Sequence, residues 1–224
     1  MSRKDVDAER DFAVVKSDWD VRAQADTMQS ICSGCSTTTQ FWESGIAEAR
    51  DLSSLLNVQP NDVVLDVGCG MGRIASAMGN AWPQATVLGV DVSSVMLQRA
   101  RKTRRMGPNV RLRTIGSKWH IPLAAAFVDV AFEVLVLQHT PFALLPDCVN
   151  ELARVIKPGG VFGCGALTER TDVSEKSKKV PTTDSWTSRA YTLEDWRTLF
   201  AGRFEFVDVH TYGPNRRMAV WKRV

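Results

Sequence analysis

The hydrophobic pattern of this chain changes close to residue 60. Before that point apolar residues recur three and four positions apart, so residues 1–60 are expected to be helical. After it, short β-branched runs alternate with amphipathic segments. Strands are expected near 62–67, 85–90, 109–115, 127–133, 160–165, 203–210 and 216–223, and helices near 71–80, 93–106, 143–156 and 192–200. This alternation predicts a mostly parallel sheet with helices on both faces and an antiparallel pair at its end.

The predicted fold is a single α/β domain with a doubly wound, mostly parallel seven-stranded sheet. Residues 1–60 would form an N-terminal helical cap, and residues 61–224 would form the core. The polar segment 168–190 predicts a long loop over the site. Ligands of such sheets bind beyond the carboxyl ends of the strands, so the residues directly after each strand are the first candidates for function.

Three glycines follow the first predicted strand. Residues 63–73 read VVLDVGCGMGR, so Gly68, Gly70 and Gly72 stand where the strand turns into a helix. Glycine permits a tight turn and a close approach of a ligand to the backbone, and the start of a helix offers free N–H groups. This order predicts a ligand site, although many nucleotide-binding proteins share it.

An acidic residue ends the second predicted strand. Asp91 closes the run VLGVD, 19 residues after Gly72. A carboxylate there can accept hydrogen bonds from both hydroxyls of a ribose, which favours an adenosine-containing ligand. A dinucleotide-binding dehydrogenase would need a third glycine at position 73, where this chain has Arg73.

Four segments together resemble the class I S-adenosylmethionine-dependent methyltransferases of the small-molecule type. They read LDVGCGMGR, GVDVSSVMLQRAR, IPLAAAFVDVAFEVLVLQHTP and ELARVIKPGGVF, and they follow one another in the order and spacing of that family. The resemblance implies a Rossmann-like methyltransferase fold with S-adenosylmethionine as the cofactor. The N-terminal helices, which lie outside the shared segments, would then act as a lid.

The resemblance also implies which residues bind the cofactor. Asp66 and the glycine turn would lie against the amino-acid end of S-adenosylmethionine. Asp91 would bind the ribose, while Val92 and Met96 would line the adenine pocket.

One position departs from the family. An acid that binds the adenine amino group often follows the third strand, but here the segment reads GSKWHIP, with Ser117 at that place. We expect Ser117, or the backbone around Lys118 and Trp119, to take over the contact.

Two residues that follow the fourth predicted strand are candidates for the chemistry. Methyl transfer needs an in-line approach, and a general base where the acceptor carries a proton. Glu133 ends an apolar run, so the sulfonium or a cationic substrate is expected to compensate its charge. The alternative for Glu133 is a structural carboxylate that caps backbone or pairs with Arg73. His139 is a natural proton acceptor near neutral pH, or a structural residue that fixes its turn.

The composition fits a globular protein, with 44% hydrophobic and 24% charged residues. The start MSRKDVDAER lacks the apolar centre of a secretory signal, and no segment is long and apolar enough to span a bilayer, so we expect a cytoplasmic protein without membrane contact. A net charge of +3 does not indicate nucleic acid. The dense run RARKTRR, Arg99 to Arg105, leaves an RNA contact open as an alternative.

Five cysteines, an odd number, fit a reducing compartment better than a disulfide framework. Cys32 and Cys35 form a C-x-x-C pair, but no second pair stands at zinc spacing. We therefore expect ordinary packing residues and no metal, with a redox pair as the alternative. Trp19, Phe41 and Trp42 are candidates for a lid over the site or for packing onto the core.

The sequence thus predicts an enzyme that moves a methyl group from S-adenosylmethionine to an oxygen, nitrogen, sulfur or carbon atom of a small molecule. The alternatives are an RNA or protein methyltransferase and a catalytically silent cofactor-binding scaffold protein. The oligomeric state cannot be predicted from these patterns.

Overall fold

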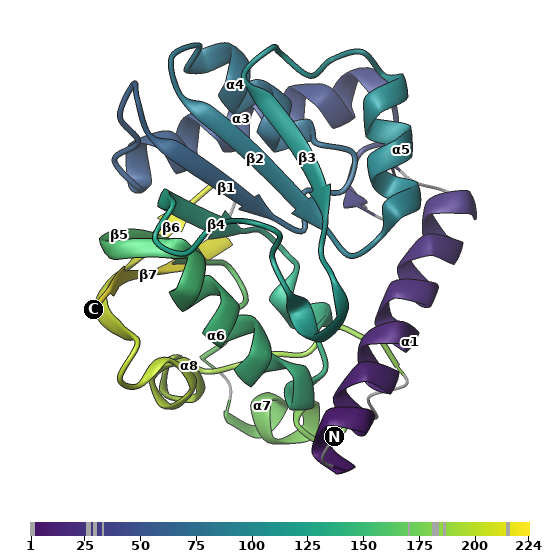
Figure 1. The fold of residues 1–224 in the computed structure, drawn as a ribbon, viewed down its shortest axis with the longest axis vertical. Coiled ribbons are helices and arrows are strands. Elements are labelled where there is room, and N and C mark those ends of the chain that lie inside the picture. Colours follow the sequence, from purple (N-terminus) through teal and green to yellow (C-terminus); the bar gives the residue numbers. More distant parts are fainter. Residues whose placement is uncertain are drawn as a thin grey trace.

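The computed structural model describes residues 3–25, 28, 31–32, 34–169, 171–180, 184–185, 187–213 and 216–224. These residues form a seven-stranded sheet with the order β3-β2-β1-β4-β5-β7-β6 (Figure 1). The strands are β1 (Val63–Val67), β2 (Thr86–Asp91), β3 (Val110–Thr114), β4 (Val128–Glu133), β5 (Ile156–Cys164), β6 (Phe204–Tyr212) and β7 (Arg216–Arg223). The first five are parallel, whereas β7 runs antiparallel to both β5 and β6. The predicted doubly wound sheet is confirmed.

Helices precede the first strand and then alternate with the strands, largely as the pattern predicts. They are α1 (Arg3–Ala25), α3 (Thr38–Leu55), α4 (Arg73–Ala81), α5 (Ser94–Lys102), α6 (Leu145–Val155), α7 (Thr171–Ser177) and α8 (Leu193–Phe200), with short 3₁₀ turns at η1 (Ser117–Trp119), η2 (Leu137–His139) and η3 (Phe142–Leu144). Side-chain caps fix three of the described starts, one of them at Thr37 before α3. The Ser93 hydroxyl accepts the Met96 N–H at 3.1 Å, and Thr192 forms a reciprocal capping box with Asp195.

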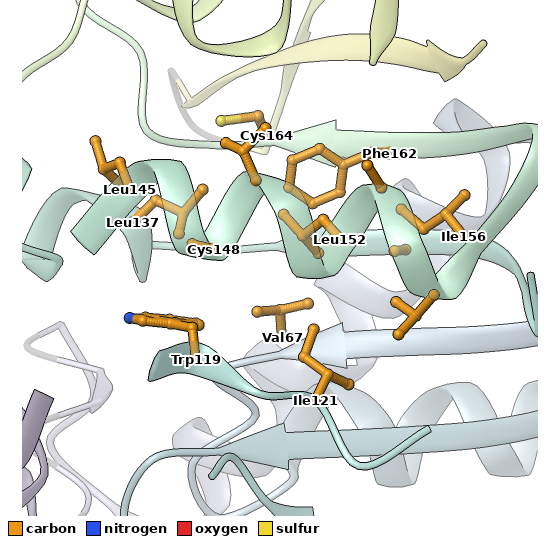
Figure 2. Close-up of a cluster of buried hydrophobic side chains, with 14 of the residues drawn as sticks. Val67, Trp119, Ile121, Leu137, Leu145, Cys148, Leu152, Ile156, Phe162 and Cys164 are labelled. Carbon is orange, nitrogen blue, oxygen red and sulfur yellow. The ribbon is translucent and has the colours of Figure 1, made fainter. Parts of the chain in front are cut away.

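Alternate residues of the strands face two separate hydrophobic layers. On one face, Val67 and Phe162 pack with Leu152 of α6 (Figure 2). Phe162 also packs edge-on against Phe200 of α8. On the other face, Val64 packs with Met78 of α4. Because strands buried on both faces carry continuous apolar runs, the short β-branched segments of the sequence mark them well.

The described N-terminal helices α1 and α3 have different neighbours. Helix α3 belongs to the second layer, where its Leu52 packs with α4 against the sheet. Helix α1 packs its Phe12 and Val15 into the first layer and lies beside α5 (Figure 1). Its Asp20 carboxylate accepts the Ser93 hydroxyl at 2.6 Å, which ties α1 to the end of β2.

The predicted loop 168–190 contains a helix, so that prediction was incomplete. Helix α7 occupies Thr171–Ser177, although its sequence TDVSEKS shows no apolar periodicity. Polar contacts hold it: the Ser174 hydroxyl donates to Asp195 at 2.5 Å, and the Ser177 hydroxyl accepts the Ala190 N–H at 2.9 Å. Residues 170, 181–183 and 186 of the predicted loop lie outside the described residues.

The carboxylate of Glu133 joins three segments at the carboxyl edge of the sheet. Its Oε2 accepts the backbone N–H groups of Val136 and Leu137 at 2.9 and 3.2 Å. Its Oε1 accepts those of Gly165 and Ala166 at 2.5 and 2.9 Å, and the side chain is fully buried. A buried carboxylate with four N–H donors is satisfied within the protein.

This arrangement predicts a stability defect for Glu133→Gln. The amide puts an NH₂ group opposite two backbone N–H donors, so these donors lose their acceptor in a dry site. We expect the free energy of unfolding to fall by about 2–4 kcal/mol in urea denaturation. Glu205→Gln, at an exposed position of β6, is the matched control and should leave it unchanged. Equal stability of the two variants would mean that the four hydrogen bonds contribute nothing.

Candidate active site

A cavity of about 560 Å³ lies at the carboxyl ends of β1, β2 and β4. This is where a sheet of this topology places its ligands. Its lining includes parts of the glycine turn, the residues after each of these strands, α1 and the segment before α8. The lining residues include Val15, Trp19, Ile31, Asp66, Gly68, Gly70, Arg73, Asp91, Val92, Met96, Ile115, Trp119, Gln138, His139, Thr187 and Ser188.

The glycine turn leaves no room for side chains. Gly68 has φ +72°, and a Cβ built on it would stand 2.3 Å from Cγ2 of Val136. Gly70 has φ +54°, and its Cβ would stand 2.8 Å from Cδ1 of Ile31. The turn is tied to β2 because the Gly68 N–H donates to the Val90 carbonyl at 2.7 Å. Its backbone is therefore fixed and open toward the cavity.

Asp91 binds the same turn with its side chain. One carboxylate oxygen accepts the Gly70 N–H and the other accepts the Ser93 N–H, both at 2.8 Å. Burial raises the pKa of Asp91 to about 6, although these two N–H groups act in the opposite direction. Each oxygen keeps a further lone pair, so the carboxylate can still accept hydrogen bonds from a ligand.

Asp66 lies in the cavity wall with an unsatisfied oxygen. The residue is only 3% exposed, and its Oδ2 has no hydrogen-bond partner among the described residues. Burial raises the pKa of Asp66 to about 7, against the charge of Arg73, which lowers it. An unpartnered carboxylate oxygen in a dry wall is a strong acceptor for a cationic group.

Arg73 is a site residue that the sequence analysis did not assign. It lines the cavity directly after the glycine turn, and its Nη2 donates to Glu48 of α3 at 2.8 Å. Glu48 also accepts a hydrogen bond from Arg216 of β7. The sequence does show an arginine among the apolar residues of a helix start, which could have marked Arg73 as a site residue. Its hydrogen-bond partner Glu48 is visible only in the structure.

The candidate adenine side is apolar. Val92, Met96 and Trp119 line the cavity as expected, together with Ile115. Ser117 is exposed, and neither Ser117 nor Lys118 belongs to the lining. The structure thus gives no support to the expected contact through Ser117.

The two candidate catalytic residues are separated. His139 lines the cavity, with its ring edge-on to Trp19 at 5.4 Å between centroids. Glu133 does not line the cavity, since its carboxylate is taken up by four backbone N–H groups. The expectation that Glu133 faces the ligand is therefore corrected: Glu133 is the structural carboxylate that caps backbone. Gly72 is the N-cap of α4 and is not part of the lining that the described residues form.

Residues 184–185 and 187–191 form a strap beside the turn that carries His139, and Thr187 and Ser188 of this strap line the cavity. The Arg189 N–H donates to the Gln138 carbonyl at 2.6 Å, and the Gln138 amide reaches the Ser188 hydroxyl at 3.3 Å. The Ser185 hydroxyl donates to Asp18 of α1 at 2.6 Å. These contacts join the strap, α1 and the η2 turn.

The aromatic lid candidates divide between two places. Trp19 lines the cavity, whereas Phe41 and Trp42 pack with Cys35 in a separate cluster. Cys32 and Cys35 form a disulfide, which differs from the expectation of ordinary packing residues. The described residues contain no cluster of three or more potential metal ligands and no helix that could span a membrane.

Comparisons with known proteins agree with this geometry. Residues 64–160 match the model of a family described as a methyltransferase domain. Trans-aconitate 2-methyltransferase of Deinococcus radiodurans is 35% identical over 126 residues, 55% of this chain and 45% of that protein. Malonyl-[acyl-carrier protein] O-methyltransferase of Xylella fastidiosa is 38% identical over 124 residues, which are 53% of this chain and 41% of that protein. The chain thus spans less than half the length of these relatives.

Solved structures show the same fold across nearly the whole chain. Geranyl diphosphate C-methyltransferase of Streptomyces coelicolor superposes with a TM-score of 0.67 at 15% identity, covering 94% of this chain and 98% of that one. Magnesium protoporphyrin IX methyltransferase of Synechocystis superposes with a TM-score of 0.68 at 15% identity, covering 95% of this chain and 99% of that one. These likenesses show the fold of the chain, and residues 64–160 match a methyltransferase domain.

The buried carboxylates predict that the ligand-free protein loses stability as pH rises. Asp66 and Asp91 have pKa values raised to about 7 and about 6 from 3.8. Between about pH 4 and 7 the folded state therefore holds protons that the unfolded state has lost, so the free energy of unfolding decreases as pH rises through this window. We expect urea denaturation to show lower stability at about pH 8 than at about pH 5.

Asp66→Asn removes the more strongly shifted group while keeping its shape. The variant should lose a large part of this pH dependence. The same change at Asp208, an exposed residue of β6, should not alter it. A pH slope in Asp66→Asn equal to that of the wild type would contradict the assignment.

Proposed function

We propose that this protein transfers the methyl group of S-adenosylmethionine to a small molecule. The observation that carries the proposal is the convergence in one cavity of the glycine turn, the unsatisfied oxygen of Asp66 and the carboxylate of Asp91. The domain family and the small-molecule methyltransferases among the relatives support it. The acceptors in the relatives' names differ from one another, so they do not specify the acceptor of this chain.

The residues present fit this cofactor. The free oxygen of Asp66 suits the cofactor's ammonium group, and the glycine turn admits close approach of its amino-acid end. Asp91, with lone pairs to spare, would accept hydrogen bonds from the ribose hydroxyls. Val92 and Met96 would lie against the adenine. When bound, S-adenosylmethionine supplies a methyl group activated by a positively charged sulfur.

The acceptor would bind on the side of the cavity that contains His139. Trp19 and Val15 of α1 offer apolar surface there, while Gln138 and Ser188 offer uncharged hydrogen-bonding groups. Holding the reacting groups in line accounts for much of such a rate enhancement. We assign His139 to the removal of the acceptor's proton, which typically contributes 10²–10⁴-fold. An acceptor with a weakly acidic hydroxyl, amine or thiol fits a histidine base.

The RNA alternative receives less support. Arg99 donates to the Gln24 carbonyl at 3.0 Å, Arg101 to the Leu112 carbonyl at 2.8 Å, and Arg105 stacks over Trp42 at 4.6 Å. Much of the basic run thus makes contacts within the protein. That the protein does not act on nucleic acid and that it is cytoplasmic both stay predictions.

Cofactor binding predicts a selective thermal shift. S-adenosylhomocysteine at about 100 times its dissociation constant stabilises by about 2.7 kcal/mol, which corresponds to about 5–10 °C for a chain of this size. NAD at the same concentration should give no shift. Stabilisation by NAD alone would refute the proposal. Methyl transfer from labelled cofactor into a metabolite extract then separates an enzyme from a silent scaffold.

The assignment of His139 predicts a defect in turnover without a defect in cofactor binding. We expect His139→Asn to lower kcat by about 10²-fold or more at neutral pH while the Kd for S-adenosylhomocysteine stays unchanged. His210→Asn on β6 is the control, because His210 is not part of the cavity lining. A wild-type kcat in His139→Asn would exclude the histidine as the base.

A further inference from the structure

Trp119 lines the cavity, and its buried indole N–H has no partner among the described residues. The residue is only 2% exposed. Figure 2 shows the nitrogen at the end of the indole that is farther from Val67 and Ile121. A buried donor without an acceptor is costly, so its position in a ligand cavity indicates that a ligand supplies the acceptor.

Two other buried indoles can be compared with Trp119 in the hydrogen bonding of their N–H groups. The Nε1 of Trp196 donates to the Ala166 carbonyl at 2.5 Å, as buried indoles usually do. The Nε1 of Trp221 also has no partner among the described residues, but Trp221 lies in the hydrophobic layer and not in the cavity lining. Trp119 alone of these three combines an unsatisfied N–H with a place in the cavity.

The backbone that presents Trp119 is strained. Lys118 has φ 53° and Trp119 has φ 59°, so two consecutive non-glycine residues adopt the left-handed conformation. Such conformations persist where the surroundings enforce them, and they concentrate at functional sites. Here the Gly116 N–H donates to the His120 carbonyl at 2.8 Å, and the Ile115 N–H donates to the Asp91 carbonyl at 2.9 Å. The turn is thus anchored to the residue expected to hold the ribose.

The lining residues on the same side of the cavity as Trp119 are mostly apolar. Val92, Met96 and Ile115 provide apolar surface around it and carry no side-chain hydrogen-bonding group. Ser117, at the position where the family often has an acid, is exposed and outside the lining. Among the described residues on this side of the cavity, the indole N–H is therefore the polar side-chain group that remains beyond Asp91.

We propose that the Nε1–H of Trp119 donates a hydrogen bond to a ring nitrogen of the cofactor's adenine. This inference rests on the proposed function, because it requires S-adenosylmethionine in the cavity. An indole is a donor only, so it recognises an acceptor on the base edge. The carboxylate common at position 117 would instead accept from the exocyclic amino group. In this chain the protein would thus recognise a ring nitrogen of the adenine with a donor, where the family often recognises the exocyclic amino group with an acceptor.

Calorimetric titration with S-adenosylhomocysteine tests the contact without turnover. Trp119→Phe removes the N–H and keeps an aromatic ring, and we expect the Kd to rise about 2- to 12-fold, the range for one neutral hydrogen bond. Trp221→Phe makes the same chemical change at the other unpartnered indole and should bind with wild-type affinity. Equal affinities in all three proteins would overturn the proposal.

Deaza analogues separate the hydrogen bond from a change in packing. The 1-deaza, 3-deaza and 7-deaza forms of S-adenosylhomocysteine each replace one ring nitrogen by C–H. In the wild type one of them should bind more weakly than S-adenosylhomocysteine, and in Trp119→Phe that difference should disappear. A difference that persists in the variant, or wild-type binding that is equal for all three analogues, would exclude the contact.

The outcomes also distinguish this inference from the proposed function. If the wild type does not bind S-adenosylhomocysteine, the proposed function fails and the inference fails with it. If the wild type binds it and the loss of the indole N–H has no effect, only the inference fails. Should Trp119→Phe not fold, equal binding of all three analogues to the wild type would still overturn the inference.

Discussion

Four backbone N–H groups around the carboxylate of Glu133 hold the carboxyl edge of the sheet in place. Two of them come from the turn after β4 and two from the segment after β5. The first pair sets Val136 against the glycine turn, where its methyl groups fill the space that a Cβ of Gly68 would need. The second pair places Ala166, whose carbonyl accepts the indole N–H of Trp196 in α8. One buried charge thus determines the positions of the turn that carries His139 and of a helix beneath it.

The sequence predicted the sheet because the evidence for a strand is local. The runs at Val63–Val67 and Thr86–Asp91 are apolar and β-branched, and each is followed by glycine or acid at the strand end. Asp91 and the glycine turn could be proposed as site residues for the same reason, because they lie close together in the sequence. The family resemblance then placed Val92 and Met96 in the cavity.

Long-range partners explain what the sequence analysis missed. Glu133 was expected at the ligand because a lone carboxylate after a strand gives no sign of N–H donors from residues 165 and 166. Trp119 was expected at the site through its backbone, and the residue lines the cavity from a turn whose unusual conformation no propensity predicts. Helix α7 was missed because its seven residues are held by Asp195 and Ala190 and not by an apolar face.

The order of the strands has a consequence for the way this chain folds during synthesis. Strand β7 lies between β5 and β6, although β6 precedes it along the chain. On the ribosome β6 therefore emerges before the strand with which it pairs, and the edge of β5 stays open until β7 follows. An open edge of this kind is a site for pairing with other chains. Arg216, the second partner of Glu48, also belongs to β7. The electrostatic surroundings of Arg73 are thus completed only when the last strand has joined the sheet, so a nascent chain can form the glycine turn before it has a finished site.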